Sequence, residues 1–129
     1  FPCQGFSVAN TKRSMKDKRN YLYLEMLRIL KDKKPKFFVA ENVKGLLSLE
    51  KGNVIEMILR DFENIGYKVD YRLLMASDYG IPQHRERVFI IGNRIGKENP
   101  FPKYSHGLKN DLFNPILEPY VSQKKYLST

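Results

Sequence analysis

The chain has very little cysteine, and it has no long apolar stretch. Its 129 residues include one cysteine, Cys3, which cannot form an internal disulfide, so packing or thiol chemistry must explain it. Burial as a small apolar side chain is the common role of a free cysteine, and nucleophilic catalysis is the alternative. No segment is long and apolar enough to span a membrane, and no secretory-type segment stands at the start. We therefore expect a reduced, cytoplasmic setting and no membrane partner.

The composition is that of one modest domain with an uneven charge. Hydrophobic residues make up 42% of the chain, which argues against wholesale disorder. The net charge is +9. Residues 1–36 hold ten Lys and Arg against three Asp and Glu, whereas residues 37–129 hold thirteen against eleven. The basic excess around Cys3 is either a solvated face or a surface for a polyanion, and its place beside the cysteine favours the polyanion.

Hydrophobic periodicity predicts two helices. Apolar residues recur at helical spacing in residues 21–33 and again in residues 53–65, so each segment is expected to bury one face. Asn53 with Glu56 predicts a capping box at the start of the second helix. Gly66 predicts its end, because glycine tolerates the backbone conformation that follows a helix.

Three further segments predict strands, namely residues 36–40, 67–76 and 87–94. The first has no polar alternation, so we expect both of its faces to be covered and its neighbouring strand to lie outside this chain. Residues 77–86 contain Gly and Pro and are expected to form a loop. Residues 95–129 contain several prolines and no clear period, which predicts an extended linker.

Three short motifs stand in order along the chain, and these are Phe1-Pro2-Cys3-Gln4, Glu41-Asn42-Val43 and Gln83-His84-Arg85-Glu86-Arg87. Together they closely resemble the DNA (cytosine-5) methyltransferases of the bacterial modification type. Residues 78–82 resemble the usual lead-in to the third motif. The resemblance covers residues 1–94 closely and residues 95–129 loosely.

The resemblance implies an α/β fold that is part of a Rossmann-like, S-adenosylmethionine-dependent methyltransferase fold. Its mixed sheet would have an antiparallel strand pair at the C-terminal end. Residues 1–94 would be the central part of the catalytic domain, from the nucleophile loop to the third motif, and residues 95–129 would lead toward a target-recognition region. The family holds S-adenosylmethionine with a glycine-rich segment, and no Gly-x-Gly-x-x-Gly occurs here. We therefore expect a central fragment. Its expected partners are double-stranded DNA and the remaining methyltransferase segments, in cis or in trans, and alone it is expected to self-associate and to be inactive.

Cys3 is the predicted nucleophile. Carbon 5 of cytosine attacks a methyl donor only after a nucleophile has added to carbon 6, and a thiolate is both a good nucleophile and a good leaving group. Glu41 is the predicted carboxyl that shares or donates a proton at nitrogen 3, since an apolar strand end favours the protonated form. A salt-bridged surface glutamate is the alternative for Glu41.

Arg87 is predicted to stabilise the charge that develops on oxygen 2, with Arg85 beside the same site. Alternation on an extended backbone would place Gln83, Arg85 and Arg87 on one face, where Gln83 would bind the substrate. His84 and Glu86 would point the other way. A charged strand entry without catalytic function is the alternative for this run.

The resemblance adds contacts that the residues alone do not give. It implies that the Phe1 carbonyl accepts from the cytosine amino group, that Pro2 lies near the methyl donor, and that Asn42 organises the loop around Cys3. The base must be flipped out of the duplex to reach them. The polar and basic residues 5–20 would form a mobile loop that closes over DNA. No metal site is expected in the chain. Contacts to the DNA backbone are expected from Lys12, Arg13, Lys16 and Lys18.

Three other functions stay open. A Cys-His hydrolase would use Cys3 with His84 or His106, but neither histidine lies in a matching signature. A non-catalytic nucleic-acid-binding fragment would keep the motifs without the activity. A relative of the family methylates transfer RNA, although Phe1 before Pro2 and Cys3 is more typical of the DNA enzymes. The amino-acid sequence does not indicate which DNA sequence is methylated, because the residues that recognise the bases are expected in a region that this chain lacks.

Overall fold

The computed structural model describes residues 1, 21–107 and 117–122. The predictions for the loop over residues 5–20, for Pro2 and Cys3, and for the four basic residues at DNA lie outside the described residues. None of the helices in the described part is long and apolar enough to cross a membrane.

Helix α1 comprises Tyr21–Lys33, the residues that the apolar period predicts. Lys31 and Lys33 lie in its last turn, where the helix dipole favours positive charge. The backbone adopts a positive φ of 47° at Lys34, directly before Pro35. The helix ends there because the residue before a proline avoids the helical conformation and proline has no N–H to donate.

Strand β1 comprises Phe37–Val43 and alternates, so the expectation that both faces are covered is wrong. Residues 38, 40 and 42 are buried, whereas the odd-numbered residues from 37 to 43 are exposed. Val39, which is 63% exposed, marks the uncovered face. An unbroken apolar run does not reveal whether the layer on its second face lies within the same chain. Glu41 and Asn42 lie inside the strand and on opposite faces, rather than after its end.

A 3-10 segment, η3 (Lys44–Gly52), leads into helix α2 (Asn53–Asn64). The capping box predicted for Asn53 and Glu56 does not form, because Asn53 already has helical dihedrals (φ −66°, ψ −28°). A capping side chain needs an extended backbone at its own residue. The residue before the helix is instead Gly52 in the left-handed conformation, with φ 90° and no capping side chain.

The remaining strands complete a three-stranded sheet. Gly66, with φ 98°, follows α2 as the predicted stop. Strands β2 (Lys68–Met75) and β3 (Glu86–Asn93) form the predicted antiparallel pair. Strand β1 pairs antiparallel with the other edge of β3, so the order is β1-β3-β2 and β1 runs in the same direction as β2. The neighbour of β1 thus lies in this chain, contrary to expectation, while its second edge is unpaired within the described residues.

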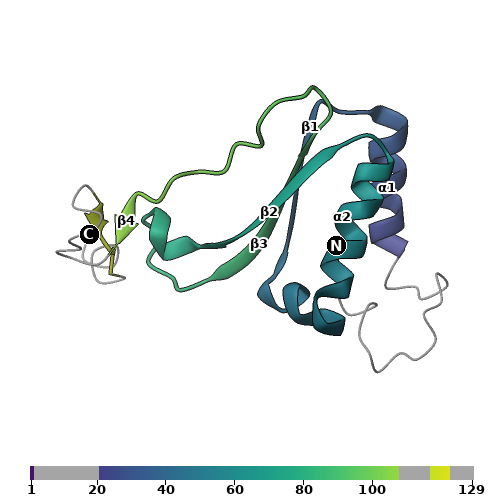
Figure 1. Cartoon of the computed structure of the whole chain (residues 1–129). Helices are drawn as coiled ribbons and strands as arrows, with labels where there is room; N and C mark the ends of the chain where they lie inside the picture. Colours follow the sequence, from purple (N-terminus) through teal and green to yellow (C-terminus); the bar gives the residue numbers. More distant parts are fainter. Residues whose placement is uncertain (2–20, 108–116, 123–129) are drawn as a thin grey trace.

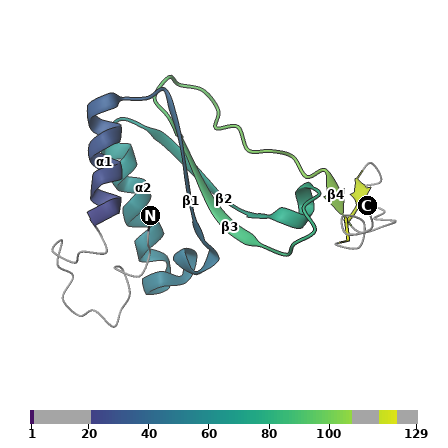
Figure 2. The same cartoon turned by 180° about the vertical axis from the view of Figure 1, so that it is seen from behind.

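The core lies between the sheet and the two helices, which stand together on one side of it (Figures 1 and 2). Phe38 packs against Phe62 with ring centroids 4.7 Å apart. Gly92 lies beneath Phe38, where an added Cβ would be 2.1 Å from a ring carbon, so this strand position requires glycine. Burial raises the pKa of the Tyr23 hydroxyl, which donates to Asp61 at 2.7 Å. The largest fully buried side chains are Phe62, Leu46, Ile58, Ile90, Val88 and Asn93.

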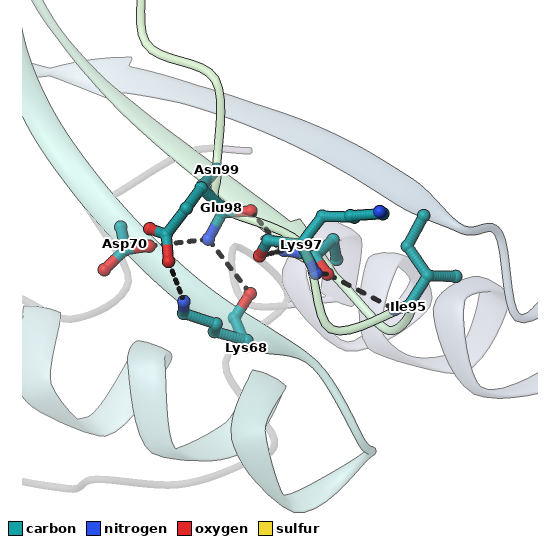
Figure 3. Close-up of polar contacts among 7 residues, drawn as sticks. Lys68, Asp70, Ile95, Lys97, Glu98 and Asn99 are labelled. Atoms are coloured by element: carbon teal, nitrogen blue, oxygen red, sulfur yellow. Dashed lines mark hydrogen bonds and ion pairs between the residues drawn. The ribbon is translucent and has the colours of Figure 1, made fainter.

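A buried asparagine reverses the chain after β3. The Nδ2 of Asn93 donates to the carbonyl of Lys97 and to Oδ1 of Asn99, each at 2.8 Å, and its Oδ1 accepts from two backbone N–H groups of the turn. Asn99 in turn donates to the carbonyl of Lys68 at 3.2 Å and to Asp70 Oδ2 at 2.6 Å (Figure 3). The turn is therefore tied to β2.

Residues 94–105 then run without helix or strand along the molecule toward η4 (Ala76–Tyr79) (Figure 1). Beyond them β4 (His106–Gly107) pairs in parallel with β5 (Glu118–Pro119). Residues 95–105, the first part of the segment that is expected to be an extended linker, form neither helix nor strand, and they are packed on the fold. The Arg72 guanidinium lies 4.7 Å from the Phe101 ring centroid. Whether residues 95–129 lead to a recognition region remains a prediction.

Candidate active site

Glu41 and Arg87 meet across the β1–β3 ladder. The register pairs Val43 with Arg87 and Glu41 with Phe89, so the two charged residues are diagonal neighbours on one face. Arg87 Nε lies 3.1 Å from Glu41 Oε1, and Arg87 Nη1 donates to the carbonyl of Glu86 at 2.8 Å. The two side chains are 24% and 50% exposed, so the pair contributes roughly 0.2–1 kcal/mol to stability. Its main effect is to orient both groups.

Apolar side chains do not enclose the Glu41 carboxylate within the described residues. Its carboxylate is half-exposed and paired with a guanidinium, which is the salt-bridged alternative that the sequence left open. The pairing uses one carboxylate oxygen, Oε1, and it brings together the two residues that the motifs single out for nitrogen 3 and oxygen 2.

A cavity of about 500 Å³ opens on the uncovered face of the sheet. Glu41, Arg85 and Arg87 all line it, as the predicted alternation requires for the two arginines. The alternation continues inward along β3, where Phe89 and Ile91 also face the cavity. The apolar part of the lining consists of Val39, Leu74, Met75, Ala76, Phe89, Ile91, Phe101 and Pro102. The three charged side chains thus lie beside the apolar lining of the same cavity.

Gln83 does not line this cavity, so the prediction of a shared face is wrong for this residue. The chain bends at residues 82 and 83, and alternation applies only to extended backbone. The N–H of Gln83 donates to the carbonyl of Ile81 at 2.8 Å, inside the loop. The side chain is exposed.

Glu86 and His84, which the alternation predicts on the other face, have partners outside the cavity. The Glu86 carboxylate pairs with the ammonium of Lys44, which comes from the start of η3. His84 Nδ1 lies 3.3 Å from the hydroxyl of Ser77. Neither residue is among those that line the cavity.

Asn42 ties the first motif to the second. Its buried Nδ2 donates to the carbonyl oxygen of Phe1 at 2.7 Å, and its Oδ1 accepts from the N–H of Val43 at 2.8 Å. The Phe1 ring packs against Tyr23 with centroids 5.2 Å apart. A carbonyl oxygen has two lone pairs, so this contact leaves the Phe1 carbonyl able to accept from a second donor. Phe1 from the first motif and Arg87 from the third therefore both contact residues of β1.

Tyr79 contributes a neutral donor beside the cavity, which it also lines. Burial raises the pKa of its hydroxyl, with Tyr104 and Asp78 adding to the rise and Arg72 opposing it. The hydroxyl therefore stays protonated at physiological pH and donates to the carbonyl of Pro102 at 3.3 Å.

Six of the predicted site residues cannot be placed, because they lie outside the described residues. They are Pro2, Cys3, Lys12, Arg13, Lys16 and Lys18. Within the part of the chain that the structure describes, no group of three or more His, Cys, Asp and Glu is arranged to hold a metal ion.

Sequence reasoning missed the apolar wall of the cavity. Phe89 and Ile91 continue the alternation of Arg85 and Arg87, so extending the period along the strand would have identified them. Phe101 and Pro102 have no such signal, because only the turn after β3 brings them back onto the sheet.

Comparison with protein families assigns residues 1–129 to the C-5 cytosine-specific DNA methylase family. The chain belongs to this family. It is 43% identical over 99% of its length to the type II methyltransferase M.AquIA of Picosynechococcus sp., of which it covers 57%. It is 46% identical over 95% of its length to the type II methyltransferase M.BspRI of Lysinibacillus sphaericus, of which it covers 28%. The chain thus spans only part of these curated relatives.

A solved structure agrees with the predicted fold. The Entamoeba histolytica methyltransferase EhMeth superimposes with a TM-score of 0.60 over 84% of this chain and 34% of that protein, at 20% identity. At this identity the likeness concerns the fold alone. The α/β architecture with its antiparallel β2–β3 pair is therefore part of a methyltransferase fold, as predicted.

Proposed function

We propose that the protein containing this chain transfers a methyl group from S-adenosylmethionine to carbon 5 of cytosine in DNA, within a bacterial restriction-modification system in the cytoplasm. One observation carries the proposal, which is that Phe1 of the first motif and Arg87 of the third both contact β1, the strand that carries the second motif. Asn42 holds the Phe1 carbonyl on one side of the strand, and Glu41 meets Arg87 on the other. Family membership and the type II methyltransferases among the relatives support the same reaction.

In this proposal Cys3 is the nucleophile. Its thiolate forms a bond with carbon 6 of a flipped cytosine, which breaks the aromatic conjugation and makes carbon 5 nucleophilic. After carbon 5 has gained the methyl group, loss of its proton to a base and cleavage of the carbon–sulfur bond restore the ring. Asn42 fixes the peptide carbonyl of Phe1, two residues before the thiol, and so positions the start of the nucleophile loop.

Glu41 and Arg87 act on the opposite edge of the base. Addition at carbon 6 moves electron density toward nitrogen 3 and oxygen 2. Glu41 would supply or share a proton at nitrogen 3, while Arg87 and Arg85 stabilise the negative charge at oxygen 2. The Arg87–Glu41 contact holds the carboxylate in position before the base arrives. The lining of the cavity by all three side chains is what supports this assignment.

S-adenosylmethionine would supply the methyl group when it is bound, and in this proposal the chain contributes only part of its site. The sequence contains no Gly-x-Gly-x-x-Gly. Pro2, the one residue that the family resemblance assigns to the cofactor, lies outside the described residues. We therefore propose that the remaining methyltransferase segments complete the cofactor site, in cis or in trans, and that the chain alone transfers no methyl groups.

A covalent-trapping experiment tests the proposal. The chain is joined to, or mixed with, the remaining methyltransferase segments and incubated with S-adenosylmethionine and duplex DNA in which 5-fluorocytosine replaces cytosine. Fluorine cannot leave carbon 5 as a proton does, so a stable protein–DNA adduct is expected. Cys3→Ser should abolish the adduct while DNA binding survives, because a hydroxyl is scarcely ionised at neutral pH.

Three controls make the result decisive. An adduct that forms equally well with the Cys3→Ser protein would show that Cys3 is not the nucleophile. An adduct with fluorinated RNA but not with fluorinated DNA would show that the substrate is RNA. Labelled methyl incorporation by the 129-residue chain alone would contradict the proposal that other segments are needed.

A further inference from the structure

The loop that delivers Arg85 to the cavity is closed at its base. The N–H of Ala76 donates to the carbonyl of Arg85 at 3.0 Å, and the N–H of Ile81 donates to the carbonyl of Ala76 at 3.3 Å. Residues 76–85 therefore form one compact unit between β2 and β3. Arg85 and Ala76, the first residue of η4, meet at the base of this unit.

Strands β4 and β5 dock on the outer end of the loop. The N–H of Ser105 donates to the carbonyl of Asp78 at 3.0 Å, and the hydroxyl of Tyr120 donates to Asp78 Oδ1 at 3.0 Å. The His106 ring lies against Gly80, which has a φ of 84° and where an added Cβ would be 2.7 Å from His106 Cε1. A backbone hydrogen bond, a side-chain hydrogen bond and close packing thus all join residues 78–80 of the loop to the β4–β5 segment.

Tyr120 contacts both limbs of the loop. Its hydroxyl binds Asp78 on the first limb, and its ring meets the His84 imidazole edge-on, with centroids 6.4 Å apart, on the second. His84 also contacts Ser77 and immediately precedes Arg85. Tyr120 is therefore connected to Arg85 by two routes. One runs through His84, the residue before Arg85, and the other runs through Asp78 and the hydrogen bond between Ala76 and Arg85.

We propose that Tyr120 and Asp78 are positioning residues for Arg85, and that they couple the β4–β5 segment to the charged rim of the cavity. This inference rests on the proposed function. Arg85 has a long, exposed side chain whose placement depends on the loop rather than on surrounding packing. Small misplacements of catalytic groups have large effects on rate, so a contact outside the cavity is able to control the reaction there.

The test uses the chain together with the remaining methyltransferase segments and measures single-turnover methyl transfer and DNA affinity separately. Tyr120→Phe removes only the hydroxyl and should slow methyl transfer roughly 10-fold, the effect of losing one hydrogen bond to a charged group, without changing DNA affinity. Asp78→Ala should do the same, whereas Asp78→Asn keeps an acceptor oxygen and should retain most of the rate. Tyr71→Phe, at an exposed tyrosine on β2, is the matched control.

A double-mutant cycle separates positioning from a general structural role. If Tyr120 acts through Arg85, Tyr120→Phe should have no further effect on the rate in an Arg85→Ala background. Additive effects in this cycle, or a Tyr120→Phe rate equal to that of the unmodified protein, would overturn the inference.

A second measurement needs no activity. The side-chain Nε–Hε resonance of Arg85, assigned by its loss in Arg85→Lys, should shift in Tyr120→Phe and remain in place in Tyr71→Phe. An unchanged Arg85 resonance in Tyr120→Phe contradicts the positioning role. If the unmodified assembled protein transfers no methyl groups, the proposed function fails, and this resonance still decides the positioning role.

Discussion

Replacing the buried Asn93 should destabilise the chain more than any exposed polar substitution. Its amide is fully buried and makes four hydrogen bonds in the turn after β3. Each such bond contributes about 0.5–1.5 kcal/mol, and a buried group left without a partner costs more. Lys97 and most of the turn are exposed, so water replaces several of the lost bonds. We expect Asn93→Ala to lower the free energy of unfolding by about 2–3 kcal/mol.

Asn93→Asp provides a pH-dependent version of the same test. The introduced carboxyl keeps the acceptor oxygens but faces two other acceptors, the carbonyl of Lys97 and Oδ1 of Asn99. We expect burial and the two facing acceptors, which disfavour the charged form, to outweigh the two backbone N–H groups that favour it, so that the pKa of the introduced carboxyl rises above its unfolded value. The folded variant therefore binds its proton more tightly than the unfolded chain, and its stability relative to the unmodified chain falls as pH rises above about 4.

Urea denaturation followed by circular dichroism measures both effects. Protein concentration is held constant, because self-association would add to the apparent stability. Asn64→Ala, at an exposed asparagine that ends α2, is the control and should change stability by no more than about 0.5 kcal/mol. The reasoning is refuted if Asn93→Ala behaves like Asn64→Ala, or if the penalty of Asn93→Asp is the same at pH 4.5 and pH 7.5.

Three further outcomes are expected. In the assembled protein Glu41→Gln should lower turnover by roughly two to four orders of magnitude with little change in DNA affinity, since the amide cannot transfer a proton; steady-state kinetics that show less than about a twofold loss would exclude the acid role. Lys12→Ala or Lys16→Ala should weaken binding to any DNA sequence and reduce the salt dependence of log K by about one per contact, and an unchanged slope in salt titrations would show that the residue meets no phosphate. The 129-residue chain should self-associate at about tens of micromolar through the uncovered face of β1 and the edge of β1 that is unpaired in the described part of the chain. In sedimentation Val39→Lys should reduce this association, whereas Ile81→Lys, at another exposed apolar residue, should not.

The local elements and the identity of the motif residues could be predicted from the sequence. The bounds of α1 agree with the apolar period, and β2 and β3 agree within about one residue with the segments rich in branched and aromatic side chains. The motifs indicate Glu41, Arg85 and Arg87, and all three line one cavity. The helices and strands can be predicted because the period of a helix or strand is a property of neighbouring residues.

Only the tertiary structure decided what those elements meet. The pairing of β1 with β3, the exposure of one face of β1, and the return of Phe101 onto the sheet each depend on contacts between residues far apart in sequence. Asn53 has helical dihedral angles in the folded chain, so it cannot take its predicted capping role. A bend at residues 82 and 83 ended the alternation before it reached Gln83. Sequence patterns describe which side chains share a face, whereas packing and hydrogen bonds between distant segments determine what lies against that face.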